Sequence, residues 1–295
     1  MRRLDALAPA KVNLGLEVVR RRDDGYHELV TLMQAVSLYD QFVWTETGTS
    51  FEYAGPVGVA PEADLVWRAL VIAEDLRNWT GRLQVVKRIP MAAGLGGGSS
   101  DAALALRLAV PDADDDELAR LGARLGSDVP FFIRGGTALA TGTGTALAPV
   151  ETAQHWLVLV TPNLVIPEKT SALYSGLEPP DFSDGANVRD ITTTLANGTN
   201  LPEYLPNAFT RQLLGYPVIR YAYDRLGQAG ASLVSVSGAG PTVYAVTAGH
   251  DDAAQIAERL ARFTPDVGAI NIVQTVGAKT AHPEIEAIAA ALRGR

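Results

Sequence analysis

Apolar residues alternate with polar or small ones near the beginning of the sequence. They occupy every second position from Val12 to Val18, which is the period of a half-buried strand. Lys11 and Asn13 stand two positions apart in this segment. The alternation therefore predicts that an ammonium and an amide side chain share one face of the strand.

The next segments predict a strand, a glycine loop and a helix in succession. A helix is predicted over 64–76, where apolar residues recur at helical spacing, and a strand is predicted over 83–87. A loop at 90–98 and an alanine-rich helix over 102–108 follow. A further helix is predicted over 114–125, because acidic residues open it and a glycine follows it.

The second half of the chain predicts a ferredoxin-like unit. Its elements are strand, helix, strand, strand, helix and strand, at 155–161, about 206–229, 232–237, 242–247, 251–263 and 269–275. That order is typical of the ferredoxin-like fold. The segment 176–204 is rich in Gly, Pro, Asp, Asn and Thr and predicts a loop with short helical pieces.

A stretch of proline and polar residues at 149–154 separates a predicted hairpin at 135–149 from the first strand of that unit. Such a stretch is typical of a domain boundary. We therefore expect an α+β protein of two domains, one over 1–152, which carries the glycine loop, and one over 153–295.

The glycine loop is the strongest chemical signal. Residues 90–103 read Pro-Met-Ala-Ala-Gly-Leu-Gly-Gly-Gly-Ser-Ser-Asp-Ala-Ala. Glycine permits close backbone approach, and the first amides of a helix attract anions, so the loop predicts a triphosphate site, with a plain flexible turn as the alternative. It is neither a Walker A loop nor a dinucleotide-binding fingerprint. Asp101 would repel phosphate, so we expect it, like Ser99 or Ser100, to cap the helix.

Composition narrows the classes of function. The chain of 295 residues has a formal charge of −8 and no cysteine. The charge argues against the general attraction to phosphate backbones that nucleic-acid binders use, and a cysteine-free chain has no disulfides or thiolate metal sites. No segment resembles a signal peptide or approaches the roughly 20 apolar residues of a membrane span. We expect a cytoplasmic protein that contacts neither nucleic acid nor membrane.

Three segments together resemble the motifs of the GHMP kinases, the superfamily of galactokinase, homoserine kinase and mevalonate kinase. They are Pro9–Leu14, the glycine loop Pro90–Ala103 and Ser237–Thr242. They occur in the superfamily's order and span nearly the whole chain. The resemblance implies an N-terminal, ATP-binding α/β domain like ribosomal protein S5 and a ferredoxin-like C-terminal domain.

Two further segments resemble one branch of that superfamily. Asp24–Leu29 and Leu125–Phe132, together with the extra glycine in Gly96–Gly98, resemble the members that phosphorylate the 2-hydroxyl of 4-diphosphocytidyl-2-C-methyl-D-erythritol in the non-mevalonate isoprenoid pathway. The resemblance implies a kinase whose partners are ATP and this cytidine-diphosphate-linked methylerythritol.

The resemblance also implies a role for each matched residue. Lys11 and Asp128 are implied as catalytic, although a lysine is usually a solvated surface residue and an aspartate at such a position usually caps a helix. The implied ATP-binding residues are Pro90, Met91, Ala92, Ala93, Gly94, Leu95, Gly96, Gly97, Gly98, Ser99 and Ser100. The implied substrate-binding residues are Asn13, Tyr26, His27, Thr170, Tyr174, Gly238, Ala239 and Gly240.

Within the substrate set, Tyr26 and Tyr174 are expected to stack on the cytosine and His27 to read its edge. The ordinary alternatives are that Tyr26 is an aromatic residue in a turn, that His27 is a surface imidazole, and that residues 238–240 form a hairpin turn. Asp64 stands where the superfamily branch more often has an asparagine, and is a candidate adenine contact.

Two other functions remain open at this point. One is a GHMP kinase with a different acceptor, such as mevalonate, homoserine or a sugar, which the segment Asp24–Leu29 disfavours because those acceptors carry no base. The other is a nucleotide-binding regulator without catalysis, which the presence of both Lys11 and Asp128 disfavours. Mg²⁺ is implied by phosphoryl-transfer chemistry, but no ligand cluster indicates its protein ligands, and nothing indicates the oligomeric state.

Overall fold

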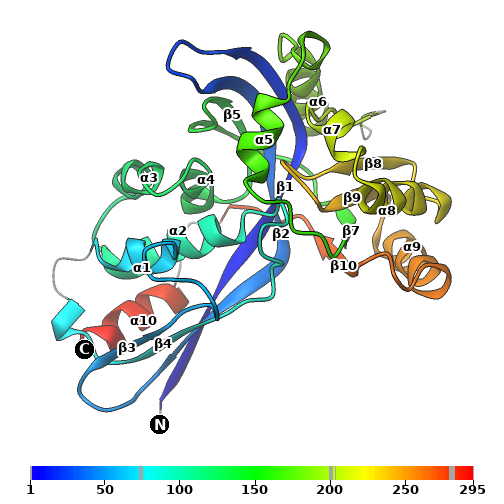
Figure 1. The fold of residues 1–295 in the computed structure, drawn as a ribbon. Coiled ribbons are helices and arrows are strands. Elements are labelled where there is room, and N and C mark those ends of the chain that lie inside the picture. The colour runs from blue at the N-terminus through cyan, green and yellow to red at the C-terminus, as the bar shows by residue number, and fades with distance from the viewer. Residues whose placement is uncertain (1, 73–75, 199–201, 203, 279–282, 295) are drawn as a thin grey trace.

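The computed structural model describes residues 2–72, 76–198, 202, 204–278 and 283–294. Two long antiparallel strands, β1 (Arg3–Arg21) and β2 (His27–Thr45), run through its centre (Figure 1). The alternation over 12–18 lies within β1, as predicted. Register shifts between Pro9 and Ala10 and between Asn13 and Gly15 interrupt the pairing on either side of Lys11, which re-aims the side chains there.

The first sheet is built around β2. Its order is β3-β4-β2-β5-β6, and β1 also pairs with β2. The added strands are β3 (Phe51–Ala54), β4 (Gly81–Val86), β5 (Thr137–Gly142) and β6 (Ala146–Val150). Strand β4 and the hairpin β5–β6 agree with the predicted strand over 83–87 and the predicted hairpin over 135–149. The strand β2 itself was not predicted.

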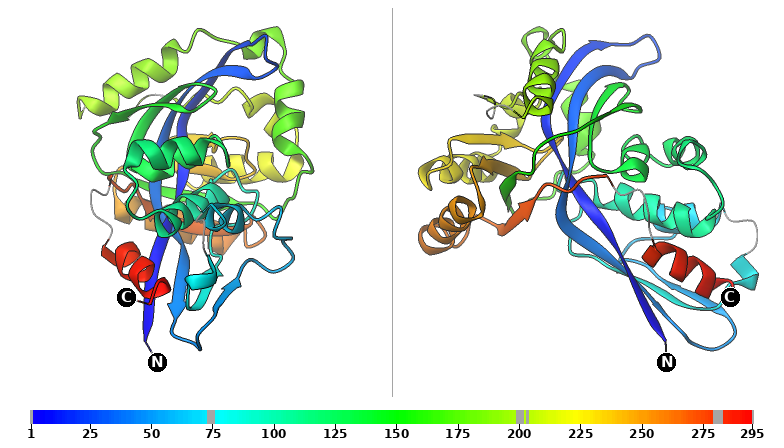
Figure 2. Two further views of the ribbon diagram at one scale, coloured as in Figure 1. Left: turned by 90° about the vertical axis from the view of Figure 1, so that its left-hand side faces the viewer. Right: turned by 180° about the vertical axis from the view of Figure 1, so that it is seen from behind.

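One face of this sheet is covered by helices (Figures 1 and 2). They are α1 (Leu65–Leu70), the 3₁₀ turn η1 (Leu76–Asn78), α2 (Gly97–Ala109), α3 (Asp115–Ala123) and α4 (Val129–Arg134). The helix predicted over 64–76 is shorter in the structure, since α1 ends at Leu70, and residues 73–75 of that prediction lie outside the described residues. Helix α2 is buried along most of its length, because its alanines allow the neighbouring elements to pack closely.

The second sheet has the order β10-β7-β9-β8, and all its pairs are antiparallel. Its strands are β7 (Trp156–Thr161), β8 (Leu233–Val236), β9 (Val243–Thr247) and β10 (Ala269–Gln274). Helices α8 (Pro217–Gln228) and α9 (His250–Phe263) pack on it. The predicted ferredoxin-like order is confirmed.

The helix predicted over about 206–229 is two helices. A short α7 (Thr210–Leu213) is separated from α8 by Leu214, Gly215 and Tyr216, and Pro217 occupies the first turn of α8. Proline disfavours helical backbone in the residue before it, so the chain leaves the first helix and starts again.

The segment 176–204 is more ordered than predicted within the described residues. It follows α5 (Lys169–Ser175) and contains the 3₁₀ turn η2 (Pro179–Asp181) and the helix α6 (Ala186–Ala196). Val188, Ile191 and Leu195 form the buried face of α6 against β1 and β2. Their spacing is that of one face of a helix. The polar composition of the segment led the sequence analysis to predict mainly loop and to miss this amphipathic helix.

The last helix, α10 (Pro283–Leu292), returns to the first sheet. It packs against β1 and α2 (Figure 2), with Ile285, Ile288 and Leu292 buried there.

The first sheet ends with β6 at Val150 and the second begins with β7 at Trp156. The first cavity of the candidate site, described below, is lined by residues from both of these groups of elements. In the described part of the chain, no helix has the length and apolarity needed to cross a membrane.

Candidate active site

A cavity of about 860 Å³ lies where the two sheets approach each other. Its lining comes from β1, β2, the glycine loop, the start of α4, the turn between β5 and β6, helix α5 and the turn before β9. Lys11, Asn13, Asp128, Thr170 and Tyr174 all line it. The fold therefore gathers residues that are far apart in the sequence, including both candidate catalytic residues.

Lys11 is a buried residue rather than a solvated surface lysine. It is 5% exposed, and its Nζ donates to Asn13 Oδ1 at 2.6 Å and lies 3.5 Å from Asp128 Oδ2. Asn13 in turn donates to Thr31 Oγ1 at 2.8 Å. This chain of hydrogen bonds fixes the ammonium, as expected of two side chains on one face of a strand.

Asp128 occupies the N-cap position of α4, but its side chain makes no capping hydrogen bond. The ordinary interpretation of this residue as a helix cap therefore does not apply. The carboxylate is instead directed toward Lys11 and is partly open to the cavity, with a side-chain exposure of 29%. A partly exposed carboxylate beside a fixed ammonium can accept a hydrogen bond from a bound hydroxyl group.

The glycine loop leads into helix α2, whose first backbone amides are not capped by a side chain. Helix α2 begins at Gly97, and its N-cap residue is Gly96, with φ of +71° and no side-chain hydrogen bond. The expectation that Ser99, Ser100 or Asp101 caps this helix is wrong. Uncapped amides at a helix start attract anions, so the local geometry is that of a phosphate site.

A second cavity, of about 310 Å³, lies on the other side of this loop. Most of the predicted ATP-binding residues line it, namely Pro90, Met91, Ala92, Ala93, Gly94, Gly96, Gly97, Gly98 and Ser99. Asp64, Leu65 and Lys87 are also among its lining residues. Ala92, Gly94 and Gly96 line both cavities, so a polyphosphate laid over the loop would reach from one cavity to the other.

Two predicted ATP-binding residues do not face this cavity. Leu95 is 1% exposed and belongs to the hydrophobic core, and it is absent from the lining of both cavities. The amide of Ser100 donates to Gly96 O at 2.9 Å, and its hydroxyl is buried on a different face of α2. We therefore correct the expectation for Ser100, because its hydrogen-bonding groups do not reach the cavity.

Asp101 forms an ion pair instead of a cap. Lys87 Nζ lies 2.6 Å from Asp101 Oδ2 and also contacts Asp40. Burial raises the pKa of Asp101 to about 7, against the opposing effect of Lys87. Asp40 accepts hydrogen bonds from the amides of Arg88 and Ile89. Lys87 thus offsets the negative charge of Asp101, which seemed unsuited to a phosphate site. The cluster of Asp40, Lys87 and Asp101 connects β2, the end of β4 and α2 next to the loop.

Asp64 supports the start of α1. Its side chain accepts from the amide of Val66 at 2.9 Å and from the hydroxyl of Tyr53 at 2.6 Å. It also lines the cavity beside the glycine loop, so an adenine contact stays a prediction.

The turn before β9 closes the cavity above Lys11. Gly238 has φ of +53°, and a Cβ atom there would lie 2.9 Å from Asn13 Oδ1 and 3.3 Å from Lys11 Nζ. Gly238 and Ala239 line the cavity, whereas Gly240 packs against Leu213 and does not. Of the three predicted turn residues, the structure thus brings the first two to the site.

Lys169 is a buried cation that the sequence analysis did not single out. Its Nζ donates to Ala92 O at 2.5 Å and to Gly240 O. Burial, with a smaller effect from Lys11, lowers the pKa of Lys169 to about 8. Lys169 therefore links the glycine loop to the turn before β9, a long-range pairing that no local sequence signal reveals.

An aromatic group borders the first cavity. His27 stacks on Tyr174, with ring centroids 4.8 Å apart, and on Phe182, with centroids 6.4 Å apart. Tyr26 stands 68% exposed beside them. These residues line a hollow of about 1020 Å³ that shares Thr170 and Tyr174 with the first cavity. The structure therefore places Tyr26, His27, Thr170 and Tyr174 together.

Phe182 is a member of this aromatic group that sequence reasoning missed. It is held there by the backbone, since Val18 and Phe182 form an isolated bridge and Ser183 N donates to Val18 O at 3.0 Å. A single aromatic residue in a polar segment was the only signal available.

Comparison with known proteins shows the family to which the chain belongs. Residues 64–136 match the family model of the GHMP kinases N terminal domain, and residues 208–266 match that of the GHMP kinases C terminal domain. A 4-diphosphocytidyl-2-C-methyl-D-erythritol kinase of Geotalea daltonii is 38% identical over 275 residues, which cover 89% of this chain and 96% of the relative. One of Thermus thermophilus is 37% identical, over 87% of this chain and 92% of the relative.

The chain belongs to the 4-diphosphocytidyl-2-C-methyl-D-erythritol kinases. A crystal structure of 4-(cytidine 5'-diphospho)-2C-methyl-D-erythritol kinase has a TM-score of 0.77 and 34% identity, and the match covers 93% of this chain and all of that one. Mevalonate kinase of L. major, in complex with R-mevalonate, has a TM-score of 0.66 at 16% identity, which shows a common fold alone.

Membership of the 4-diphosphocytidyl-2-C-methyl-D-erythritol kinases makes this protein a phosphotransferase of the GHMP superfamily that uses ATP. The predicted two-part GHMP architecture is confirmed. Among the described residues, no group of three or more His, Cys, Asp or Glu side chains is arranged so that it could hold a metal ion.

Proposed function

We propose that this protein transfers the γ-phosphate of ATP to the 2-hydroxyl of 4-diphosphocytidyl-2-C-methyl-D-erythritol, in the non-mevalonate route to isoprenoids. The observation that carries the proposal is the position of the Lys11–Asp128 pair. The pair lies between a glycine loop suited to phosphates and an aromatic group suited to a base. A substrate with a nucleobase at one end and a hydroxyl at the other would span this distance.

Lys11 and Asp128 divide the chemistry between them. Asp128 accepts a hydrogen bond from the 2-hydroxyl and holds its oxygen toward the γ-phosphorus. Lys11 offsets the negative charge on the transferred phosphoryl oxygens and favours ionisation of the attacking hydroxyl. Phosphoryl transfer passes through a loose transition state, so positioning and charge neutralisation matter more than a strong base.

The glycine loop holds the donor. The free amides at the start of α2 and the positive end of its dipole would bind the phosphates of ATP. The adenosine would occupy the cavity lined by residues 90–94, Asp64 and Leu65. Gly238 and Ala239 would approach the diphosphate of the acceptor from the opposite side of Lys11.

Magnesium would enter with the nucleotide. The described residues contain no cluster of acidic or histidine ligands, so phosphate oxygens would supply most of its coordination. The protein oxygens available beside the loop include the Ser99 hydroxyl and the Asp128 carboxylate. The ion would neutralise phosphate charge, and such a set of hard oxygen ligands fits Mg²⁺.

The cytosine would lie against the rings of Tyr26, Tyr174 and Phe182. Burial, with a smaller effect from Arg21, lowers the pKa of His27 below its usual value. This shift favours the neutral imidazole, which offers one donor and one acceptor to the edge of the base. Stacking gives affinity for any base, and this hydrogen-bonding edge gives the choice among bases.

We also propose that residues 1–152 and 153–295 are the two domains of the enzyme. The change from the first sheet to the second between Val150 and Trp156 supports this division. Helix α10 is an addition from the second segment to the first domain.

An acceptor assay tests the function. With ATP and Mg²⁺, the protein should phosphorylate 4-diphosphocytidyl-2-C-methyl-D-erythritol, and mevalonate, homoserine and galactose should remain unmodified under the same conditions. Transfer to one of those three acceptors would replace our assignment with another GHMP kinase activity. Binding of ATP without transfer to any acceptor would favour a non-catalytic binder.

Phe182 gives a separate test of the base site. Replacing Phe182 with Ala should raise the KM for the cytidine substrate by about 10-fold and leave the KM for ATP unchanged, because stacking of a base on an aromatic ring contributes about 1–3 kcal/mol. Steady-state kinetics with each substrate varied in turn measures both constants. Phe263→Ala, at an exposed ring on α9, is the matched control. An unchanged KM for the cytidine substrate would place the base elsewhere.

A further inference from the structure

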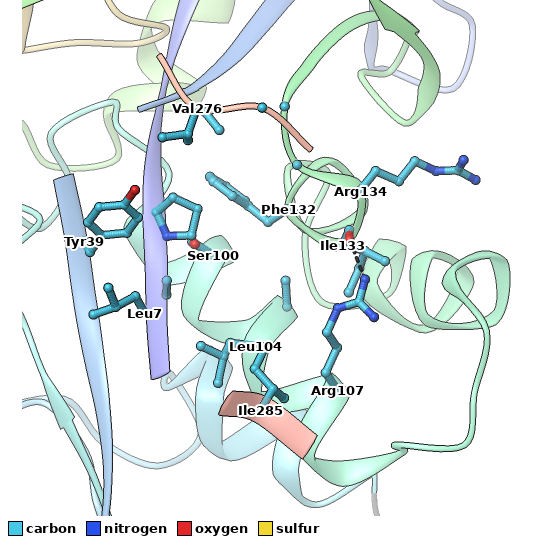
Figure 3. A pocket seen from close by; sticks show the side chains of 17 residues that line it. Leu7, Tyr39, Ser100, Leu104, Arg107, Phe132, Ile133, Arg134, Val276 and Ile285 are labelled. Atoms are coloured by element: carbon cyan, nitrogen blue, oxygen red, sulfur yellow. Dashed lines mark hydrogen bonds between the residues drawn. The ribbon is translucent and has the colours of Figure 1, made fainter. Parts of the chain in front are cut away.

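A separate cavity of about 110 Å³ lies behind the glycine loop (Figure 3). It is bordered by β1, β2, α2, α4, the segment after β10 and the start of α10, and it is partly open. None of its lining residues lines the cavities assigned above to ATP, the acceptor or the cytosine. On α2 it is lined by Ser100, Ala103, Leu104 and Arg107, a different face from Gly97, Gly98 and Asp101.

The cavity contains one unsatisfied polar group, the hydroxyl of Ser100. Ser100 is 2% exposed, and its Oγ has no hydrogen-bond partner. Ser100 is among the residues that line the cavity, together with Leu104 and Phe132 (Figure 3). A buried hydroxyl without a partner is uncommon in a folded protein, so a ligand or a water molecule that bonds to it is favoured.

The charged residues of the lining are already paired. Arg107 donates to Asp115 Oδ1 at 2.8 Å and to Ile133 O at 2.6 Å. Arg134 donates to Asp116 Oδ1 at 2.5 Å. Both guanidinium charges are thus offset by carboxylates, and an uncharged ligand leaves these ion pairs intact.

The size and lining of the cavity define the ligand class. An apolar cavity of about 150 Å³ holds benzene, a molecule of six heavy atoms. This cavity is somewhat smaller but partly open, so a molecule of five or six heavy atoms can fill it and extend through the opening. Leu104, Phe132 and Ile133 offer apolar contact, and Ser100 offers one hydrogen bond. We propose that the cavity is a binding site for a small uncharged alcohol of five or six heavy atoms, whose oxygen bonds to Ser100.

The cavity is coupled to the active site through Phe132. A Cβ atom added to Gly96 would lie 2.8 Å from Phe132 Cζ and 3.0 Å from Lys11 Cγ. Phe132 thus fills the space between the cavity, the N-cap of α2 and the stem of Lys11. It also lies on α4, the helix that begins directly after Asp128. We therefore expect an alcohol packed against Phe132 to change the affinity for ATP, and ATP to change the affinity for the alcohol by the same factor.

Two probes test the site in the full chain. Xenon, under pressure in crystals of the protein, should occupy the cavity because it is apolar. Cyclopentanol should bind to the protein in solution, as measured by titration of NMR chemical shifts, and should move signals from Phe132 and Ile133. Density for water alone, with no xenon and no shift changes, overturns the proposal.

Two variants separate space from hydrogen bonding. Ala103→Leu fills the cavity from its buried wall and should abolish binding of both probes, whereas Ala146→Leu, at an exposed position of β6, should not affect either. Ser100→Ala should keep xenon and weaken cyclopentanol by about 5-fold, the effect of one neutral hydrogen bond. Thermal unfolding checks that each variant is folded. If Ala103→Leu does not fold, equal binding of cyclopentanol to Ser100→Ala and to the unchanged protein still overturns the proposed hydrogen bond.

The coupling has its own measurement. Saturating cyclopentanol should change the dissociation constant of ATP by at least twofold in the unchanged protein and leave it unchanged in Ala103→Leu. Both quantities are binding constants, so this result does not depend on which acceptor the kinase uses. An identical dissociation constant with and without cyclopentanol overturns the coupling through Phe132.

Discussion

Replacing Lys11 with Met should lower kcat about 10³-fold and leave the dissociation constant of ATP nearly unchanged, because removing one fixed positive group from a phosphoryl transition state costs about 10²–10⁵-fold in rate. The ammonium is buried and held by Asn13 and Asp128, so it is already in place when charge develops on the phosphoryl oxygens. Met keeps most of the stem volume that packs near Gly96. Single-turnover rates and ATP titration measure the two effects separately.

The control for Lys11 removes a cation without touching the site. Arg82 on β4 forms an exposed ion pair with Glu52 on β3. The variant Arg82→Met should therefore keep normal turnover. A near-normal kcat for Lys11→Met would defeat the catalytic assignment. A raised dissociation constant for ATP with an unchanged kcat would instead make Lys11 a ground-state contact of the nucleotide.

The parts of the site that the sequence predicted are those with a local signal. Alternation in β1 placed Lys11 and Asn13 on one face, and the 2.6 Å hydrogen bond between them confirms it. The glycine run predicted a loop between a strand and a helix, and β4 and α2 flank it as expected. The resemblance then connected this loop with Asp128, which no periodicity links to Lys11.

The parts that could not be predicted depend on contacts between distant segments. Asp101 was predicted to be a cap because its charge would repel phosphate, but it pairs with Lys87, which comes from the loop after β4. Ser100 stands in the glycine motif, yet the phase of α2 turns its hydroxyl away from the phosphate site. Phe182 and Lys169 join the site because the chain returns beside β1 and the glycine loop. Local composition carries no information about such pairings.

The aspartate of the pair should give the second large effect. Asp128→Asn should lower kcat by about 10²-fold, the lower end of general acid–base and positioning effects, with little change in the dissociation constants of either substrate. Asn keeps the shape and one oxygen, so it still contacts the hydroxyl, but it no longer provides a charged acceptor beside Lys11. Rapid-quench measurement of the phosphorylated product gives the rate of the chemical step. Asp116→Asn, in an exposed pair with Arg134, is the matched control.

The double variant decides whether the two residues act as a unit. If Lys11 and Asp128 position one hydroxyl together across their 3.5 Å contact, Lys11→Met with Asp128→Asn should be about as slow as Lys11→Met alone, because groups that act together are strongly non-additive. Multiplied losses would instead mean that each residue stabilises the transition state independently. A normal rate for Asp128→Asn would leave the ammonium and the helix amides as the source of catalysis. The carboxylate would then serve only to hold Lys11 in place.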